Sequence, residues 1–205
     1  MSIVKLNNRG VKNATAFGSI TGLGSMTFIK KLTASSSSTL SFVDGSSSVV
    51  LDNTYKEYVF TFNNMHPASD GANFQVNFRD GSTDYDAIKT TTVFLANHNE
   101  DGSGAVLEYK ASNDLAQSTN FQNLGESVGA DNDQCVSGSL HLFNPSSTTF
   151  VKHFIATTNN YDSGNNSQIF YVSGYCNTTT AIDGVQFKFS SGNIDAGDIC
   201  LYGIA

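Results

Sequence analysis

Residues 183–204, DGVQFKFSSGNIDAGDICLYGI, decide the fold class. The first half alternates Phe187 and Phe189 with polar neighbours, which is the period-two pattern of a strand with one buried face. Residues 195–198 are polar and are expected to stay outside the packing, whereas residues 199–204 are apolar on both faces. A strand of that kind lies centrally in a sheet or has its second face covered. The core therefore closes only when this segment docks.

Short alternating segments recur along the rest of the chain at the turn spacing of a sandwich or barrel. The clearest hairpin places Asn144-Pro145-Ser146-Ser147 between two apolar strands. Only 2 prolines occur and Trp is absent, while small polar residues abound, which suits strands joined by turns and suits long helices poorly. We expect strands at residues 25–32, 39–43, 49–51, 55–62, 73–79, 88–96, 105–110, 120–124, 135–143, 150–156, 167–176 and in both halves of 183–204. The fold class that follows is all-β, an antiparallel jelly-roll-like β-sandwich.

At 205 residues the chain is long enough for one sizeable core, and we predict a single sandwich domain at residues 25–205. Residues 1–24 are punctuated by glycine and are predicted to form an N-terminal arm that docks on a partner or neighbouring subunit. The alternative is an edge strand followed by a loop over the domain's own core. No secretory signal and no stretch long enough to span a bilayer are visible, so synthesis in a reducing cytoplasm without membrane insertion is expected.

The net charge bears on the kinds of partner to expect, and the cysteine spacing bears on disulfide bonding. The formal net charge of −7 is dispersed and no basic run occurs, which disfavours binding to nucleic acid. The three cysteines, Cys135, Cys176 and Cys200, lack CxxC spacing. They are predicted to be buried reduced thiols, with a single disulfide as the alternative.

Three segments resemble small virion proteins of tailed bacteriophages, especially those infecting marine bacteria. They are YKEYVFTF at 55–62 followed by MHPASD at 65–70, LFNPSSTTFVKHF at 142–154, and FKFSSGNI at 187–194 running on to Gly197 and LYGI at 201–204. The similarity spans roughly residues 34–204. It implies a lectin-like jelly roll in a tail fibre or on the capsid surface, and it supplies no catalytic motif.

The function expected from this resemblance is that of a non-enzymatic virion structural protein, a tail-fibre, appendage or capsid-decoration component. Its partners would be copies of itself, for example in a trimer, and other capsid or tail proteins, and its location would be the virion after synthesis in the host cytoplasm. The alternative is a carbohydrate-binding module that adsorbs to host-surface glycans. A small glycan hydrolase is the least favoured hypothesis, because no carboxylate stands in a context that marks it as catalytic. No cofactor is predicted.

One loop has the ligand spacing of a calcium-binding EF-hand. Asn97, Asn99 and Asp101 supply oxygens at alternate positions, Gly102 occupies the sixth position and Glu108 the twelfth. The flanking residues, however, predict strands, whereas an EF-hand requires helices. We therefore favour a hairpin tip in which Asp-Gly makes the turn, and we keep these residues as calcium candidates.

Tyrosines beside Asn and Asp side chains are candidates for stacking against sugar rings. Tyr85 and Tyr161 lie in or beside polar segments and are the candidate binding residues. Tyr171 and Tyr175 lie within a strand, and core or interface packing is the preferred interpretation for them.

His141 and His153 flank the predicted hairpin and could form a zinc-binding pair only if both pointed to one face. A four-residue loop at 144–147 would place His141 and His153 on opposite sheet faces, so structural histidines are predicted.

Overall fold

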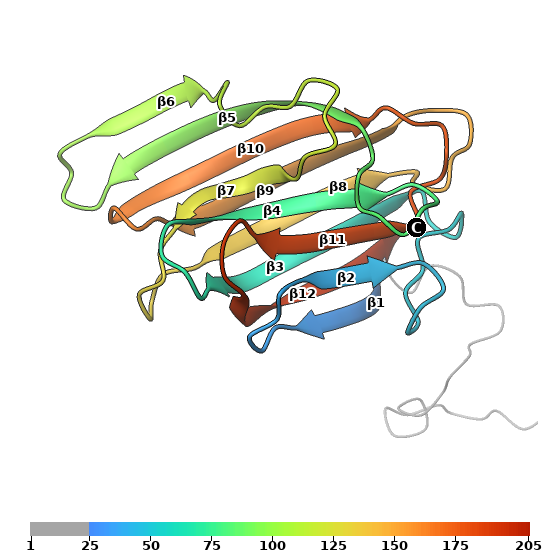
Figure 1. The fold of residues 1–205 in the computed structure, drawn as a ribbon, viewed down its shortest axis with the longest axis horizontal. Coiled ribbons are helices and arrows are strands. Elements are labelled where there is room, and N and C mark those ends of the chain that lie inside the picture. The colour runs from blue at the N-terminus through green and yellow to red at the C-terminus, as the bar shows by residue number, and fades with distance from the viewer. Residues whose placement is uncertain (1–24) are drawn as a thin grey trace, which may run out of the picture.

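The computed structural model describes residues 25–205, and the predicted arm at residues 1–24 lies outside them. Two antiparallel sheets pack face to face, so the predicted β-sandwich is confirmed (Figure 1). Its twelve strands are β1 (Met26–Thr33), β2 (Leu40–Val43), β3 (Glu57–Pro67), β4 (Ala72–Arg79), β5 (Lys89–Asn99), β6 (Ala105–Tyr109), β7 (Gln122–Val128), β8 (Val136–Phe143), β9 (Lys152–Tyr161), β10 (Asn166–Cys176), β11 (Gly184–Phe189) and β12 (Ile194–Ile204). Within the described residues there is no helix able to cross a membrane.

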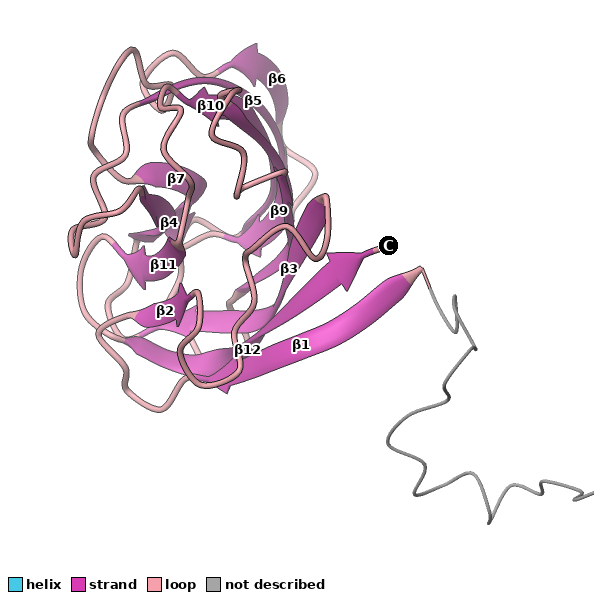
Figure 2. Cartoon of the chain, turned by 90° about the vertical axis from the view of Figure 1, so that its right-hand side faces the viewer, coloured by secondary structure: helices cyan, strands magenta, loops and turns pink. Residues whose placement is uncertain are grey.

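The larger sheet has eight strands in the order β1-β12-β3-β8-β9-β10-β5-β6, and the smaller has four in the order β2-β11-β4-β7. Figure 2 shows the small sheet as one layer and the curved large sheet as the other. The pairing is nested: β1 pairs with β12, β2 with β11, β3 with β8 and β4 with β7. The remaining strands, β5, β6, β9 and β10, widen the large sheet. The jelly-roll connectivity stays an interpretation, which this nesting supports.

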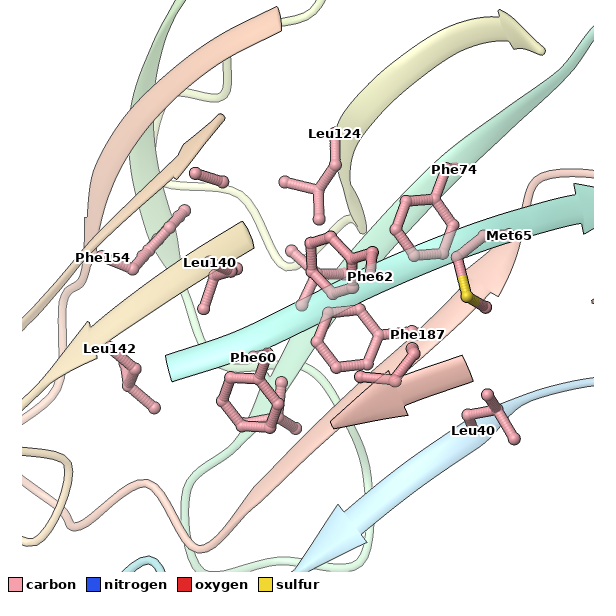
Figure 3. Packing of buried hydrophobic residues seen from close by; sticks show 14 of the residues in the cluster. Leu40, Phe60, Phe62, Met65, Phe74, Leu124, Leu140, Leu142, Phe154 and Phe187 are labelled. Carbon is pink, nitrogen blue, oxygen red and sulfur yellow. The ribbon is translucent and has the colours of Figure 1, made fainter. Parts of the chain in front are cut away.

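Phenylalanine rings fill the space between the sheets (Figure 3). Phe187 in β11 lies at the centre of this core, with its ring centroid 5.1 Å from Phe62 and 5.5 Å from Phe60, both in β3. From the small sheet, the ring centroids of Phe74 in β4 and Phe42 in β2 lie 6.0 and 6.4 Å from that of Phe187. All five side chains are at most 1% exposed. The alternating phenylalanines of the sequence are therefore the inward-facing set of each strand.

The segment 183–204 forms β11 and β12, as predicted, and β12 lies between β1 and β3 inside the large sheet. None of residues 195–198 is buried, in agreement with the prediction, but the second strand begins earlier than predicted, at Ile194 and not at Ile199. Residues 195–198 belong to β12, which pairs with β3 through two register shifts, between Ile194 and Ala196 and between Ala196 and Asp198. These irregularities let a polar stretch follow the sheet while Asp195 and Ala196 remain exposed.

Two further local predictions needed correction. Residues 49–51 are not a strand, although Val49 and Leu51 are buried. The β8–β9 hairpin exists, but its loop runs over residues 144–151 and begins with Asn144 at a left-handed φ of 45°. In the resulting register His141 lies opposite Ile155.

That register also overturns the predicted placement of the two hairpin histidines. Cross-strand partners share a face, and His153 lies two residues before Ile155, so His141 and His153 point to the same face. His141 Nδ1 contacts Glu57 Oε1 at 2.6 Å, and the His153 ring lies beside Tyr175. Both are engaged by neighbouring side chains, which agrees with structural roles.

The sandwich has two ends, and they differ in character. At the distal end β5 turns into β6 and β9 turns into β10; at the proximal end lie Lys89, Cys176 and Ile204. Beyond the small sheet, β5 and β6 continue the large sheet as a projecting edge (Figure 1). All five residues of β6 are exposed. We call β6 the wing, because neither of its faces is covered.

Candidate functional site at the distal end

A hollow of about 250 Å³ lies on the outer face of the large sheet at the distal end. Its floor is a row of three cross-strand neighbours, His98 in β5, Ser167 in β10 and Tyr161 in β9. The other lining residues are Glu100, Asn159, Asn160, Asn165 and Asn166. We call this the Tyr161 hollow. It combines one carboxylate with amides, hydroxyls and an imidazole.

Tyr161 joins two turns that are distant in sequence. Its Oη donates a hydrogen bond to Glu100 Oε2 at 2.8 Å and lies 3.2 Å from Asn165 Oδ1. The backbone N–H of Glu100 donates to the Asn165 carbonyl at 3.0 Å, so the β5–β6 and β9–β10 turns are tied together. The hydrogen bond to the carboxylate raises the pKa of the Tyr161 phenol above its ordinary value. The hydroxyl is thus a proton donor at neutral pH.

The β9–β10 turn is held from below by Asp162, which is only 5% exposed. Its Oδ1 accepts hydrogen bonds from the backbone N–H groups of Gly164 at 2.9 Å and Asn166 at 2.8 Å. Its Oδ2 accepts from Gln168 Nε2 at 2.7 Å, and Asn166 Nδ2 donates to both oxygens at 3.0 Å. A buried carboxylate with this many donors fixes the turn, including the left-handed φ of 61° at Asn165.

Asn159 is oriented by the same part of the sheet. Its Nδ2 donates to Ser167 Oγ at 3.0 Å and to the Gln168 carbonyl at 2.9 Å. Because both amide hydrogens are used, the group that Asn159 offers to a ligand is the acceptor Oδ1.

A second hollow of about 310 Å³ adjoins the first. It is lined by Asn99, Glu100, Asp101, Gly164, Asn165 and Asn166, and so shares three residues with the Tyr161 hollow. The Glu100–Asn165 contact forms the boundary between the two. An occupant larger than one ring can therefore continue from one hollow into the other.

Of the two predicted binding tyrosines, only Tyr161 lies in this site. Tyr85 lies at the proximal end, beside Gly184 and the ion pair between Arg79 and Asp183. That pair is bidentate: Arg79 Nε donates to Asp183 Oδ1 at 2.9 Å and Nη2 donates to Oδ2 at 3.0 Å, and these hydrogen bonds to the carboxylate raise the pKa of Arg79. The two tyrosines do not share a surface, because Tyr85 lies in the β4–β5 loop at the proximal end and Tyr161 ends β9 at the distal end.

The calcium candidates fall in three places. Asn99 ends β5 and Asp101 lies in the turn that follows; Asn99 Nδ2 donates to Ser103 Oγ and Asp101 Oδ1 accepts from the Ser103 N–H. Glu108 lies three residues into β6, about 10 Å along the strand, and its Oε1 pairs with Lys110 Nζ at 3.1 Å. Strands flank the turn, as the hairpin interpretation predicted.

Asn97, the first calcium candidate, lies in β5 opposite Val106 and Gln168. Within residues 25–205 no group of three His, Cys, Asp or Glu side chains is placed to hold a metal ion. Calcium binding stays a prediction that this geometry does not favour.

Apolar and aromatic side chains cover the outer face of β6, β5 and β10. Phe94, Tyr109 and Tyr171 form one cross-strand row, 50%, 48% and 49% exposed, and Leu107 and Ile169 flank Ala96 in the next row. Core packing, one of the two interpretations preferred for Tyr171, is therefore wrong. We call these residues, Phe94, Leu107, Tyr109, Ile169 and Tyr171, the outer-face patch.

Buried cationic side chains occupy the inner face at the proximal end. Lys89 in β5 and Lys152 in β9 are neighbours of Cys176 in β10, and all three are 0% exposed. Lys89 Nζ donates to the Ala87 carbonyl at 2.8 Å, and Lys152 Nζ donates to two loop carbonyls. Burial lowers the pKa of Lys89 to about 8 and raises that of Cys176 to about 12.

The three cysteines are free thiols; Cys176 and Cys200 are buried, as predicted, whereas Cys135 is only half-buried. This removes the single-disulfide alternative from the structure.

Sequence analysis identified Tyr161 but missed Glu100, Asn165 and Asp162. The available signal was the polar run at residues 162–167 facing a second polar turn at residues 99–103. Only the pairing of β5 with β10 brings the two runs together.

Comparison with known proteins gave no match: no family model, no curated protein and no solved structure matches this chain.

Proposed function

We propose that the protein is a non-enzymatic structural component that assembles through the wing and the outer-face patch. The observation that carries the proposal is the exposure of β6: Leu107 is 81% exposed and Val106, on the other side of the strand, 50%. Apolar side chains exposed on both faces of one strand are costly for a monomer and are typical of a surface that a partner covers.

The edge position of β6 adds directional hydrogen bonding to this apolar surface. Among residues 25–205, β6 pairs with β5 alone, so the backbone N–H and C=O groups along its other side face away from the described sheet. Such an edge is a template for adding a strand from another chain. Assembly with a second copy, as in the predicted homo-oligomer, or with another structural protein would satisfy both the edge and the patch.

The assignment to a bacteriophage virion rests on the resemblance of the segments at 55–70, 142–154 and 187–204. On that basis the assembly is a tail fibre, an appendage or a capsid decoration, and the partners are other virion proteins. Immunogold labelling of particles of the phage that encodes the protein tests this part. Label on the head or the tail is expected, and particles without any label would contradict the virion assignment.

The assembly surface is tested separately by sedimentation velocity of the full chain. Leu107→Lys places a charge on the edge strand and is expected to shift the protein towards monomers while the circular dichroism spectrum stays unchanged. Phe150→Lys is the matched control, because Phe150 is 69% exposed but lies in the β8–β9 loop at the proximal end. A wild-type protein that is strictly monomeric and does not bind virion proteins would refute the proposal.

A further inference from the structure

We propose that the Tyr161 hollow binds one ring of a neutral saccharide, so that the protein is a glycan-binding module as well as an assembly component. The hollow lies over β5, β10 and β9 at the distal end and includes no residue of the wing or of the outer-face patch, whose Ile169 lies two residues from Ser167 on the same face. Glycan binding and assembly are therefore measured separately.

The hydrogen-bonding groups of the hollow match vicinal hydroxyls. Glu100 offers carboxylate oxygens, Asn159 offers its Oδ1, and Asn165 offers an amide oxygen 3.2 Å from the Tyr161 hydroxyl. Each sugar hydroxyl both donates and accepts, and acceptors close together on a rigid surface are suited to receive two adjacent hydroxyl protons. The aromatic ring of Tyr161, on the floor of the same hollow, provides an amphipathic surface for a sugar ring.

Electrostatics select a neutral ligand. Among the lining residues of the hollow there is no Lys or Arg, and Glu100 supplies a negative charge. The carboxylates of Asp131 and Asp133 also lie near enough to act on the phenol of Tyr161. A sulfated, phosphorylated or sialylated sugar would bring a second negative charge into this field, where the imidazole of His98 is the one lining group that protonation can make cationic.

The site is also preorganised. Asp162 holds the β9–β10 turn through buried hydrogen bonds, the Glu100 N–H is bonded to the Asn165 carbonyl, and the amide of Asn159 is fixed by two donated bonds. Polar groups held in this way lose little conformational entropy when a ligand binds, which favours recognition of a small, weakly apolar molecule.

Size limits the occupant. The volume of about 250 Å³ is below the ~300–1,000 Å³ typical of pockets for drug-sized ligands, which suits a single sugar ring. The adjoining hollow of about 310 Å³ can take a second ring across the Glu100–Asn165 boundary. A disaccharide is therefore expected to bind more tightly than the corresponding methyl glycoside.

The test is an NMR titration of the full-length ¹⁵N-labelled protein with the methyl glycosides of glucose, galactose, mannose and N-acetylglucosamine. We expect at least one to bind with a Kd of about 1 mM, with shifts concentrated at Glu100, Asn159 and Asn165. Sialic acid and glucose 6-phosphate should produce no shifts there. Binding should persist in EDTA, because the saccharide contacts protein groups directly.

Paired variants separate this site from a general surface effect. Tyr161→Phe removes the hydroxyl that bonds Glu100, and Glu100→Gln removes the charge; each is expected to weaken binding about tenfold. Tyr175→Phe is the matched control, because Tyr175 lies at the proximal end of β10, beside His153, and belongs to neither the hollow nor the outer-face patch. Tyr175→Phe should bind like the wild type.

Four results would each overturn the inference: no shift with any of the four glycosides, equal weakening in the Tyr161 and Tyr175 variants, stronger binding of the anionic sugars, or loss of binding in EDTA. Circular dichroism of each variant verifies that its fold is intact, and Glu100→Gln, at an exposed position, provides a second variant if Tyr161→Phe fails to fold. The oligomeric state, measured in parallel, reports on the assembly surface and not on this site.

Discussion

Lys89 lies directly opposite Cys176 in the antiparallel β5–β10 pair, and both side chains are completely buried. Burial disfavours the charged form of each group, so it shifts the pKa of a lysine downward and the pKa of a thiol upward. Burial lowers the pKa of Lys89 from 10.5 to about 8 and raises that of Cys176 from 9.0 to about 12. The charges of Cys176 and Asp80 partly oppose the lowering of the pKa by burial, for Lys152 as well as for Lys89.

The first prediction concerns stability between pH 8 and 10.5. In that window the unfolded chain holds a proton on Lys89 that the folded chain has released, so the free energy of unfolding rises with pH. From pH 9 upward the folded state retains the Cys176 proton that the unfolded state loses, which opposes the rise. Urea unfolding should therefore show a gain of about 1 kcal/mol between pH 8 and 9, followed by a plateau.

Three variants test whether Lys89 and Cys176 cause this pH dependence of the free energy of unfolding. Lys89→Met should remove the gain, and Cys176→Ala should extend it towards pH 10.5. Lys56→Met, at an exposed position, is the control and should leave the profile unchanged. A Lys89→Met profile that still rises between pH 8 and 9 would contradict the assignment.

The second prediction concerns thiol reactivity. Cys135 is half-buried, whereas Cys176 is fully buried with a strongly raised pKa. Because the thiolate is the reactive form, the native protein at pH 8 should react with a disulfide reagent first at Cys135, and Cys176 should react only on unfolding. Mass spectrometry of the labelled peptides measures this, and early labelling of Cys176 would show that the proximal end opens.

The third prediction concerns Asp162. Asp162→Asn keeps the size of the side chain but points an N–H donor at the donors of Asn166 and Gln168. We expect a loss of about 2–4 kcal/mol in the free energy of unfolding, measured in urea at pH 7. Asp84→Asn, on an exposed loop, should cost nothing measurable; similar values for the two variants would mean that the network is not structural.

The fourth prediction concerns the centre of the core. Phe187 contacts rings from both sheets, so Phe187→Ala should cost about 3–5 kcal/mol through lost contacts and a cavity. Phe150→Ala removes the same ring from an exposed loop and should change stability by less than about 0.5 kcal/mol. Equal unfolding midpoints for these two variants would contradict the assigned core.

Local patterns in the sequence were sufficient for most strands. The alternation in residues 167–176 predicts β10, and the sequence around Asn144-Pro145 predicts the β8–β9 hairpin. Local patterns failed where tertiary contacts decide. Residues 49–51 are apolar but bury their side chains without joining a sheet, and residues 195–198 join one through bulges despite their polarity.

The candidate site was less accessible from the sequence. Tyr161 has the residue type and polar surroundings of a binding residue, so it was predicted, but the same criteria also selected Tyr85 at the other end of the sandwich. Glu100 and Asn165 meet only because β5 pairs with β10 in the observed register. No periodicity encodes such a long-range register, and a shift by one residue would send these side chains to the other face.

The nested strand pairing also governs how the protein is made. Translation releases β1, β2, β3 and β4 before any of their partners β12, β11, β8 and β7 in the nested pairs exists. During that interval the phenylalanines of β3 and β4 lack the complete sheets against which they pack in the folded protein. Contacts between residues so far apart in sequence form slowly, in about milliseconds to seconds for all-β domains. Folding must therefore largely follow synthesis, and a growing chain depends on chaperones or on rapid completion to escape aggregation through its exposed strands.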